Sequence, residues 1–269
     1  KAYSYPKQKE RRMRMMKKSG SIIEAVAGAV IFVIGLVLCF HNYVQKGNTA
    51  YAVSLLVAIA GVIVLIAGIC NIVSKGERKP VDTKVLAQAA LCAALCYVGA
   101  TFIKIDVPVG TEKTMFHFGN VFCVLAALLI GGAWGGLAGA VGMTISDLTT
   151  AYVTSAPKTF ILKLCIGLIV GFVAHKLFHL SKDHSAKYVT VATIVSSVCG
   201  MAFNIVADPV VGYFYKSYLL GVPQDLAKAL AKIGAITTSV NAVIAVIVAT
   251  IIYLALRPVM KKTGMLREL

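Results

Sequence analysis

Ionisable and amide side chains interrupt the long apolar stretches in the second half of this sequence. Inside a bilayer such side chains are costly, so each one is a candidate functional residue. Carboxylate, amide and ammonium groups together offer donors and acceptors to a small polar ligand. The candidate ligand-binding residues are Lys113, His117, Asn120, Asp147, Tyr152, Lys158, Lys163, Asn204, Asp208 and Asn241.

Eight apolar segments must position these side chains, and most approach the length that a helix needs to cross a bilayer. They span approximately 21–40, 51–73, 84–102, 118–133, 135–151, 160–177, 188–207 and 234–256. The glycine-rich turn 131–136 separates the fourth from the fifth, because residues 118–151 would otherwise form one helix that is far too long. The sequence therefore predicts an all-α integral membrane protein with eight helices.

The composition excludes a soluble secreted or cytosolic enzyme. Hydrophobic residues make up 58% of the chain and charged residues 14%, and the mean hydropathy is +0.82. An average soluble domain is closer to a quarter charged. No nucleotide-binding GxxxxGK[ST] loop and no GxSxG or HExxH motif occurs. Neither the histidines His175 and His179 nor the seven cysteines form a convincing metal-ligand array. We expect no enzyme activity, no metal and no cofactor.

The formal net charge of +16 indicates topology rather than a nucleic-acid partner. Alternating spans place 19 of the 27 basic residues on one side: eight up to Lys18, four in 75–84, three in 176–187 and four from Arg257 onward. By the positive-inside rule, both termini are expected in the cytoplasm.

A change in composition divides the chain into five parts. We expect a basic cytoplasmic tail (1–20), a two-helix transmembrane hairpin (21–73), a polar linker (74–81), a six-helix membrane domain (82–257) and a cytoplasmic tail (258–269). Nearly all the unusual polar residues fall in the six-helix domain, so function is expected there.

In this topology the polar groups of the six-helix domain lie at one depth, near the outer side. A through-pore would need polar lining along its length, so the pattern favours a pocket open to the exterior. Two expected outer loops, Lys104–His117 and Asp208–Lys232, could cover that pocket. Ordinary helix caps and an interfacial aromatic belt are the alternative explanation.

Small residues form a ridge on the segment 84–102. Ala89 and Ala93 are four residues apart, as are Ala90 and Ala94, and such spacing lets two helices approach closely in lipid. From the residues alone, the facing helix could belong to this chain or to another.

Motifs between Phe116 and Lys176 resemble those of the substrate-binding (S) component of energy-coupling factor (ECF) vitamin transporters. They are Gly119-Asn120 at the start of a helix, the glycine-rich turn, a Gly-Ala-x-x-Gly pattern followed later by Asp147, and the Ala-Pro-x-Thr-x-x-x-Lys sequence from Ala156 to Lys163. The resemblance covers about 82–257 and implies a six-helix bundle; the preceding hairpin departs from the family pattern.

The resemblance implies a multi-pass protein of a prokaryotic cell membrane that captures a water-soluble vitamin or related micronutrient at its outer face. It would dock, through Ala89 and Ala93, on a transmembrane coupling subunit driven by two ATPase subunits, which alone use ATP. The loop Lys104–His117 would act as a lid. A stand-alone secondary transporter and a membrane enzyme using Asp147 are the alternatives. Riboflavin, pyridoxine, a pyrimidine precursor of thiamine and pantothenate all remain possible ligands.

Overall fold

The computed structural model describes residues 5–42, 49–73 and 83–266, and the chain forms two compact units, Lys1–Val81 and Asp82–Leu269. The expected linker 74–81 lies outside the described residues, as do the ends of both expected tails. Each unit is described separately below.

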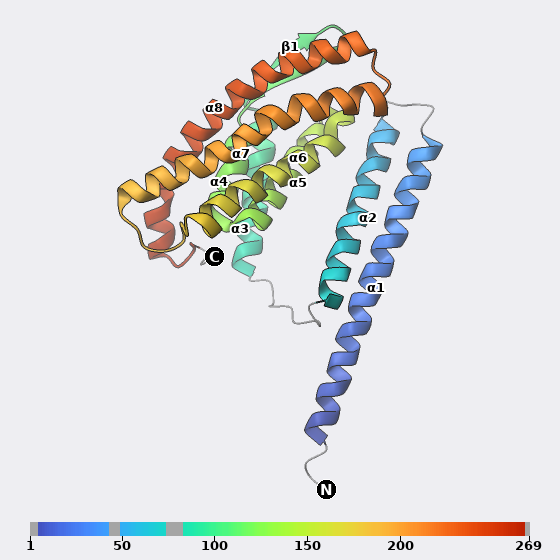
Figure 1. The fold of residues 1–269 in the computed structure, drawn as a ribbon, viewed down its shortest axis with the longest axis vertical. Coiled ribbons are helices and arrows are strands. Elements are labelled where there is room, and N and C mark those ends of the chain that lie inside the picture. Colours follow the sequence, from blue (N-terminus) through green and yellow to red (C-terminus); the bar gives the residue numbers. More distant parts are fainter. Residues whose placement is uncertain (1–4, 43–48, 74–82, 267–269) are drawn as a thin grey trace. The chain divides into compact units, whose positions relative to one another are not determined.

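The first unit is a pair of helices, α1 (Tyr5–His41) and α2 (Thr49–Val73) (Figure 1). Glycines bring the two backbones together. A Cβ atom on Gly28 would collide with the backbone of Leu65, and one on Gly61 with that of Phe32. Apolar side chains such as Val33 and Val37 point outward. Small residues inside and apolar ones outside are typical of a helix pair in lipid.

The second unit contains six α-helices: α3 (Thr83–Thr101), α4 (Gly119–Ile130), α5 (Gly132–Leu148), α6 (Ala156–Gly171), α7 (Ala186–Phe214) and α8 (Gln224–Lys262). Short helical segments extend this set: the 3-10 turn η2 (Val153–Ser155) precedes α6, and the π-helices η3 (Phe172–Leu177) and η4 (Tyr215–Leu219) follow α6 and α7. The all-α membrane class is confirmed.

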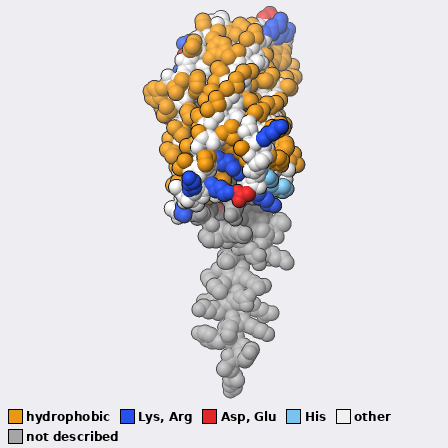
Figure 2. Space-filling view, turned by 90° about the vertical axis from the view of Figure 1, so that its left-hand side faces the viewer, with side chains coloured by type: hydrophobic (Ala, Val, Ile, Leu, Met, Phe, Trp, Pro, Cys, Tyr) orange, Lys and Arg blue, Asp and Glu red, His pale blue; other side chains and the backbone are white. Residues whose placement is uncertain are grey.

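Five described stretches are long and apolar enough to cross a membrane: Ser19–Cys39, Thr83–Thr101, Val153–Leu177, Ala186–Leu219 and Gln224–Lys262. Apolar side chains cover most of the face seen in Figure 2, and charged ones gather mainly at its two ends. This distribution is what a multi-pass membrane protein requires.

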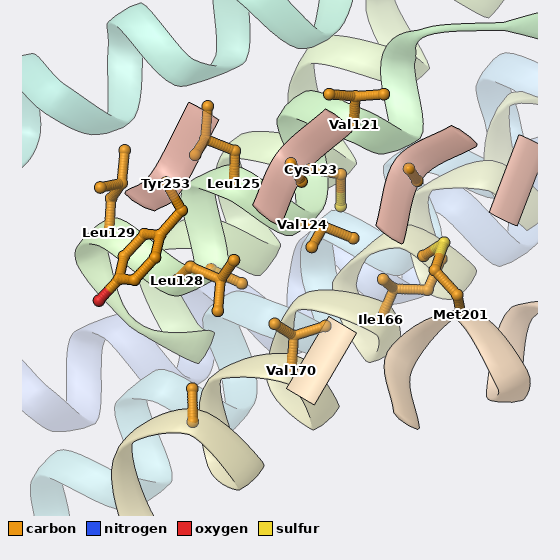
Figure 3. Close-up of a cluster of buried hydrophobic side chains, with 14 of the residues drawn as sticks. Val121, Cys123, Val124, Leu125, Leu128, Leu129, Ile166, Val170, Met201 and Tyr253 are labelled. Atoms are coloured by element: carbon orange, nitrogen blue, oxygen red, sulfur yellow. The ribbon is translucent and has the colours of Figure 1, made fainter. Parts of the chain in front are cut away.

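Helix α4 lies at the centre of the second unit. Eleven of its 12 residues are buried, because the other helices surround it. Leu128 belongs to one buried cluster with Ile166 of α6, Met201 of α7 and Tyr253 of α8 (Figure 3). A helix of this length is too short to cross a lipid bilayer by itself. Because other helices enclose α4, it does not need to span the bilayer.

Glycines also determine how α5 packs. Gly131 adopts φ +87° and separates α4 from α5, a backbone conformation that glycine tolerates best. A Cβ on Gly167 of α6 would collide with Gly136, and one on Gly142 with the carbonyl oxygen of Ala93 on α3. The glycine-rich stretch therefore serves contacts inside the bundle.

The first expected outer loop is a β-hairpin. Strand β1 (Lys104–Val109) pairs antiparallel with β2 (Glu112–His117), in the register Lys104 opposite His117. Gly110, with φ +60°, makes the turn. β-Branched residues such as Ile105, Val107 and Thr114 favour strands, and they form a hairpin where a loop was expected.

The expectation of a second long loop over Asp208–Lys232 was wrong. Helix α7 continues past Pro209 to Phe214, η4 follows, and α8 begins at Gln224. Proline removes one helical hydrogen bond and its ring clashes with the carbonyl one turn earlier, but the apolar residues after Pro209 continue the helix.

Candidate functional site

A single cavity of the second unit collects the polar residues of the six helices. Its volume, counted as the space open to the centre of a water-sized sphere, is about 110 Å³. One water occupies roughly 10–15 Å³ on that measure, so the cavity holds a ligand of several non-hydrogen atoms or more. The wall comes from β2, α4, α5, the α5–α6 turn, α6, α7, η4 and α8.

All of the sequence-predicted ligand-binding residues line this cavity. Its wall contains Lys113, His117, Asn120, Asp147, Tyr152, Lys158, Lys163, Asn204, Asp208 and Asn241. They come from β2, the α5–α6 turn and the five helices α4 to α8, and the packing of these elements brings them together. That they bind a ligand stays a prediction.

Three buried polar side chains in the wall lack a protein partner. Asn120 and Asn204 are each 1% exposed, and their Oδ1 atoms accept no hydrogen bond from any described residue. Lys163 is 6% exposed, and its ammonium lies more than 4.0 Å from every described carboxylate. These three side chains, called the floor cluster below, leave hydrogen-bonding atoms available to a ligand in the cavity.

The two carboxylates of the wall have protein partners. Thr159 of α6 donates a hydrogen bond to Oδ2 of Asp147 at 2.5 Å. Asp208 of α7 pairs with the ammonium of Lys158 at 2.8 Å and accepts a hydrogen bond from Thr238 of α8 at 3.0 Å. The Asp208 network therefore joins three helices around the cavity.

The β-hairpin is attached to α8 over one side of the cavity. Asn241 donates from Nδ2 to the carbonyl oxygen of Met115 at 3.1 Å, and its Oδ1 accepts from the backbone N–H of His117 at 3.0 Å. The hydroxyls of Thr114 and Thr237 lie 3.0 Å apart. These bonds hold β2 in place as part of the wall.

Tyr152 attaches the same hairpin to the α5–α6 turn. Its hydroxyl lies 3.0 Å from both Oδ1 of Asp106 and the carbonyl oxygen of Thr114. Burial and the neighbouring Asp106 raise the pKa of Tyr152 well above its ordinary value, so the hydroxyl keeps the proton that it donates.

His117 is neutral in the closed wall. Burial, together with the nearby positive charge of Lys163, lowers the pKa of His117 to about 3. Its Nδ1 accepts a hydrogen bond from the backbone N–H of Gly119 at 3.1 Å, which requires an unprotonated Nδ1. Hence His117 supports the start of α4 instead of acting as a cation.

Several wall residues were missed by the sequence analysis. They are Thr114, Met115, Met143, Ser155, Thr159, Pro209, Gly212, Lys216, Leu230, Ala231, Gly234, Thr237 and Thr238. Helical spacing could have found some of them. Gly212 and Lys216 follow Asp208 at intervals of four, and Thr237 and Thr238 precede Asn241 by four and three, which puts each set on one helix face.

The predicted docking residues Ala89 and Ala93 face other helices of the second unit. Ala89 is buried in the main hydrophobic cluster, and Ala93 packs against α5. Ala90 and Ala94, the parallel pair on the same helix, are exposed. The exposed face of α3 that carries small residues therefore contains Ala90 and Ala94, each one residue after a predicted docking residue.

The histidines near the opposite end of α6 have structural partners. His175 contacts the hydroxyl of Ser181 at 2.9 Å and the carbonyl oxygen of Ala127 at 3.2 Å. Within the described ranges, no group of three histidine, cysteine, aspartate or glutamate side chains could hold a metal ion.

Comparison with known families gives one match. A family model described as "ECF-type riboflavin transporter, S component" matches residues 81–258, which is more than half of the chain and includes every residue of the cavity wall. No curated protein and no solved structure matches.

Proposed function

This chain belongs to the family of S components of ECF-type riboflavin transporters, and from that premise we propose that its cavity captures a water-soluble vitamin of the flavin type for import. The family is one of substrate-binding subunits of transporters, and we propose that this chain catalyses no reaction of its own. Riboflavin enters the proposal because the family description names it.

The floor cluster is the observation that carries this proposal. The unpartnered Oδ1 atoms of Asn120 and Asn204 need N–H or O–H donors, and the ammonium of Lys163 needs an acceptor. Riboflavin supplies both, because its ring has one N–H between two carbonyl oxygens and its side chain carries several hydroxyl groups. Met115 and Met143 in the wall offer polarizable contacts to the faces of such a ring.

We further propose that the cavity opens to the outside of a prokaryotic cell membrane. The support is the concentration of basic residues on the opposite side of the predicted topology. No step of capture needs a cofactor; in this family scheme two partner ATPase subunits use the ATP.

The coupling subunit is proposed to dock on the exposed face of α3. Ala90 and Ala94 are the small residues available there, whereas Ala89 and Ala93 are occupied inside the bundle. We expect Ala94→Leu to reduce ATP-dependent uptake by the reconstituted transporter while ligand binding by the isolated chain continues. Ala93→Leu should instead lower the stability of the chain itself.

Titration of the purified chain with riboflavin tests the proposed function, with quenching of flavin fluorescence as the signal and no ATP present. Asn120→Ala and Asp147→Ala are expected to weaken binding about tenfold or more, because each removes a buried polar contact. Ser239→Ala is the matched control, since the Ser239 hydroxyl bonds only to the Ala235 carbonyl of its own helix. Uptake into proteoliposomes by this chain alone, driven by an ion gradient, would contradict the proposal.

A further inference from the structure

Positive charge also gathers at the end of the second unit opposite the cavity. Residues 176–187 and 257–262, around the α6–α7 connection and at the end of α8, include six basic residues but only one acidic residue, Asp183. Lysine and arginine side chains gather at the lower end of the coloured surface in Figure 2. The six, called the inner basic cluster below, are Lys176, Lys182, Lys187, Arg257, Lys261 and Lys262.

Contacts between α8 and the α6–α7 connection hold this cluster together. The guanidinium of Arg257 donates hydrogen bonds to the carbonyl oxygens of Leu180 at 3.2 Å and of Lys182 at 2.9 Å. One turn further along α8, Lys261 pairs with Asp183. The end of α8 therefore fixes the backbone of the connection that leads into α7.

The lysines at the two ends of the unit differ in how they are paired. Four described lysines at the cavity end have carboxylate partners: Lys104 with Asp106, Lys158 with Asp208, Lys216 with Glu112, and Lys228 with Asp225. In the inner basic cluster, no described carboxylate lies within 4.0 Å of the ammonium groups of Lys182, Lys187 and Lys262. These three lysines are exposed, so their N–H donors are available to an anion.

The first turn of α7 adds to the positive potential. Ser185 caps this 29-residue helix, and its hydroxyl accepts a hydrogen bond from the backbone N–H of Tyr188 at 3.4 Å. One cap satisfies only one of the free N–H groups at a helix start, and the positive end of the helix dipole favours an anion there. Lys187 lies in the same turn of the helix.

Exposed apolar side chains lead away from these lysines along two helices. On α7, Val191 and Val198 follow Lys187 at helical spacing and are exposed. On α8, the exposed Val259 lies one turn before Lys262. In a bilayer such faces contact acyl chains, and lysines at their ends reach the level of the headgroups. A ligand with an anionic head and apolar chains fits both features.

We propose that the inner basic cluster binds the headgroup of an anionic phospholipid, in the leaflet that faces the cytoplasm in the predicted topology. The acyl chains of that lipid lie against the exposed faces of α7 and α8. Basic residues next to membrane spans attract anionic lipids, whereas the ammonium of a zwitterionic headgroup is repelled by the lysines. No residue of the cluster lines the cavity, so the lipid site is independent of the vitamin that the cavity takes.

Native mass spectrometry of the full chain, released from bilayers with equal amounts of phosphatidylglycerol and phosphatidylcholine, tests the lipid site. We expect the protein to retain phosphatidylglycerol in a severalfold excess. The excess should shrink as salt is added before release, because ions screen the lysines. Equal retention of the two lipids would overturn the proposal.

Paired lysine variants assign the preference to the cluster. Lys182→Gln combined with Lys187→Gln should lower the ratio of retained phosphatidylglycerol to phosphatidylcholine by about threefold to tenfold. Lys228→Gln combined with Lys232→Gln, two exposed lysines at the cavity end, is the matched control. Both double variants keep the basic residues up to Lys18, so a difference between them belongs to the cluster. Equal ratios in the two double variants would contradict the proposal.

Two further measurements separate a lipid from other anionic partners. Phosphatidylglycerol added in detergent should raise the unfolding temperature of the unmodified chain, and inorganic phosphate at the same concentration should not. An equal rise with both would show that the cluster binds a free phosphate group, and the lipid assignment would fail. It would also fail if the inner double variant kept its lipid preference but no longer co-purified with the partner subunits, because the cluster would then be a protein interface.

Discussion

The side-chain amide oxygen of Asn241 accepts a hydrogen bond from the backbone N–H of His117 at 3.0 Å. Both residues are buried, and they are 124 positions apart in the sequence. Because the Asn241 amide also donates to the carbonyl oxygen of Met115, one side chain satisfies two main-chain groups of β2. This contact makes the hairpin a fixed wall of the cavity.

Asn241→Leu should release the hairpin from α8. The variant leaves the N–H of His117 and the carbonyl of Met115 without their partner, at a cost of about 1–3 kcal/mol for each buried group. We expect faster hydrogen exchange over residues 112–117 and faster dissociation of the bound ligand. Ser239→Ala, on the same helix, should leave both rates unchanged; equal rates in the two variants would contradict the role given to Asn241.

Lys158 and Asp208 should show energetic coupling. Lys158→Met or Asp208→Asn alone leaves the other charge without its main partner, and we expect a loss of roughly 1–3 kcal/mol in the free energy of unfolding. The loss is smaller than for a fully enclosed pair because the side chain of Asp208 is 26% exposed. The double variant should lose less than the sum of the single variants, as measured by thermal unfolding in detergent. Additive losses would show that the pair is not coupled.

Two glycines should respond in opposite ways to the same substitution. A Cβ atom on Gly234 of α8 has no atom within 4 Å, so Gly234→Ala should stabilise the helix by about 0.5–1 kcal/mol. Gly167→Ala drives a Cβ into the backbone of Gly136 and should destabilise the bundle by about 1–3 kcal/mol. Unfolding temperatures of the two variants check both signs.

The open space at Gly234 belongs to the cavity wall. Gly234→Phe should therefore fill the cavity and abolish ligand binding while the unfolding temperature stays near that of the unmodified chain. A variant that still binds riboflavin would place the ligand elsewhere.

Stability should fall in mild acid because of His117. Burial lowers the pKa of His117 from 6.5 to about 3, so between these values the unfolded chain binds a proton that the folded chain does not. Stability is therefore lost as pH falls from about 6.5 toward 3, by up to about 1.4 kcal/mol per pH unit. Unfolding temperatures of the unmodified chain and of His117→Gln, compared between pH 7 and pH 5, should converge as pH falls. Parallel curves would contradict a buried neutral His117.

Two features could be predicted from the sequence: the lengths of the apolar segments, and the position across the membrane of the few polar side chains within them. Helix rise and bilayer thickness are local constraints, so the six helices of the second unit appear near their predicted places. Asn120 and Asp147 lie at helix ends, and they share the cavity with Lys163, which lies in the middle of α6. That these side chains would line one cavity could be predicted without knowing which helices are neighbours.

Only the tertiary structure decided which face of each helix points inward. In lipid both faces of a helix are apolar, so the sequence carries no polar face that marks the outside. For this reason Ala89 and Ala93 could not be told from Ala90 and Ala94. In the structure Ala89 is buried and Ala93 is half-buried against α5, whereas Ala90 and Ala94 are exposed. The same limit hid Thr237 and Thr238, which reach the cavity because packing turns that face of α8 toward α7 and the hairpin.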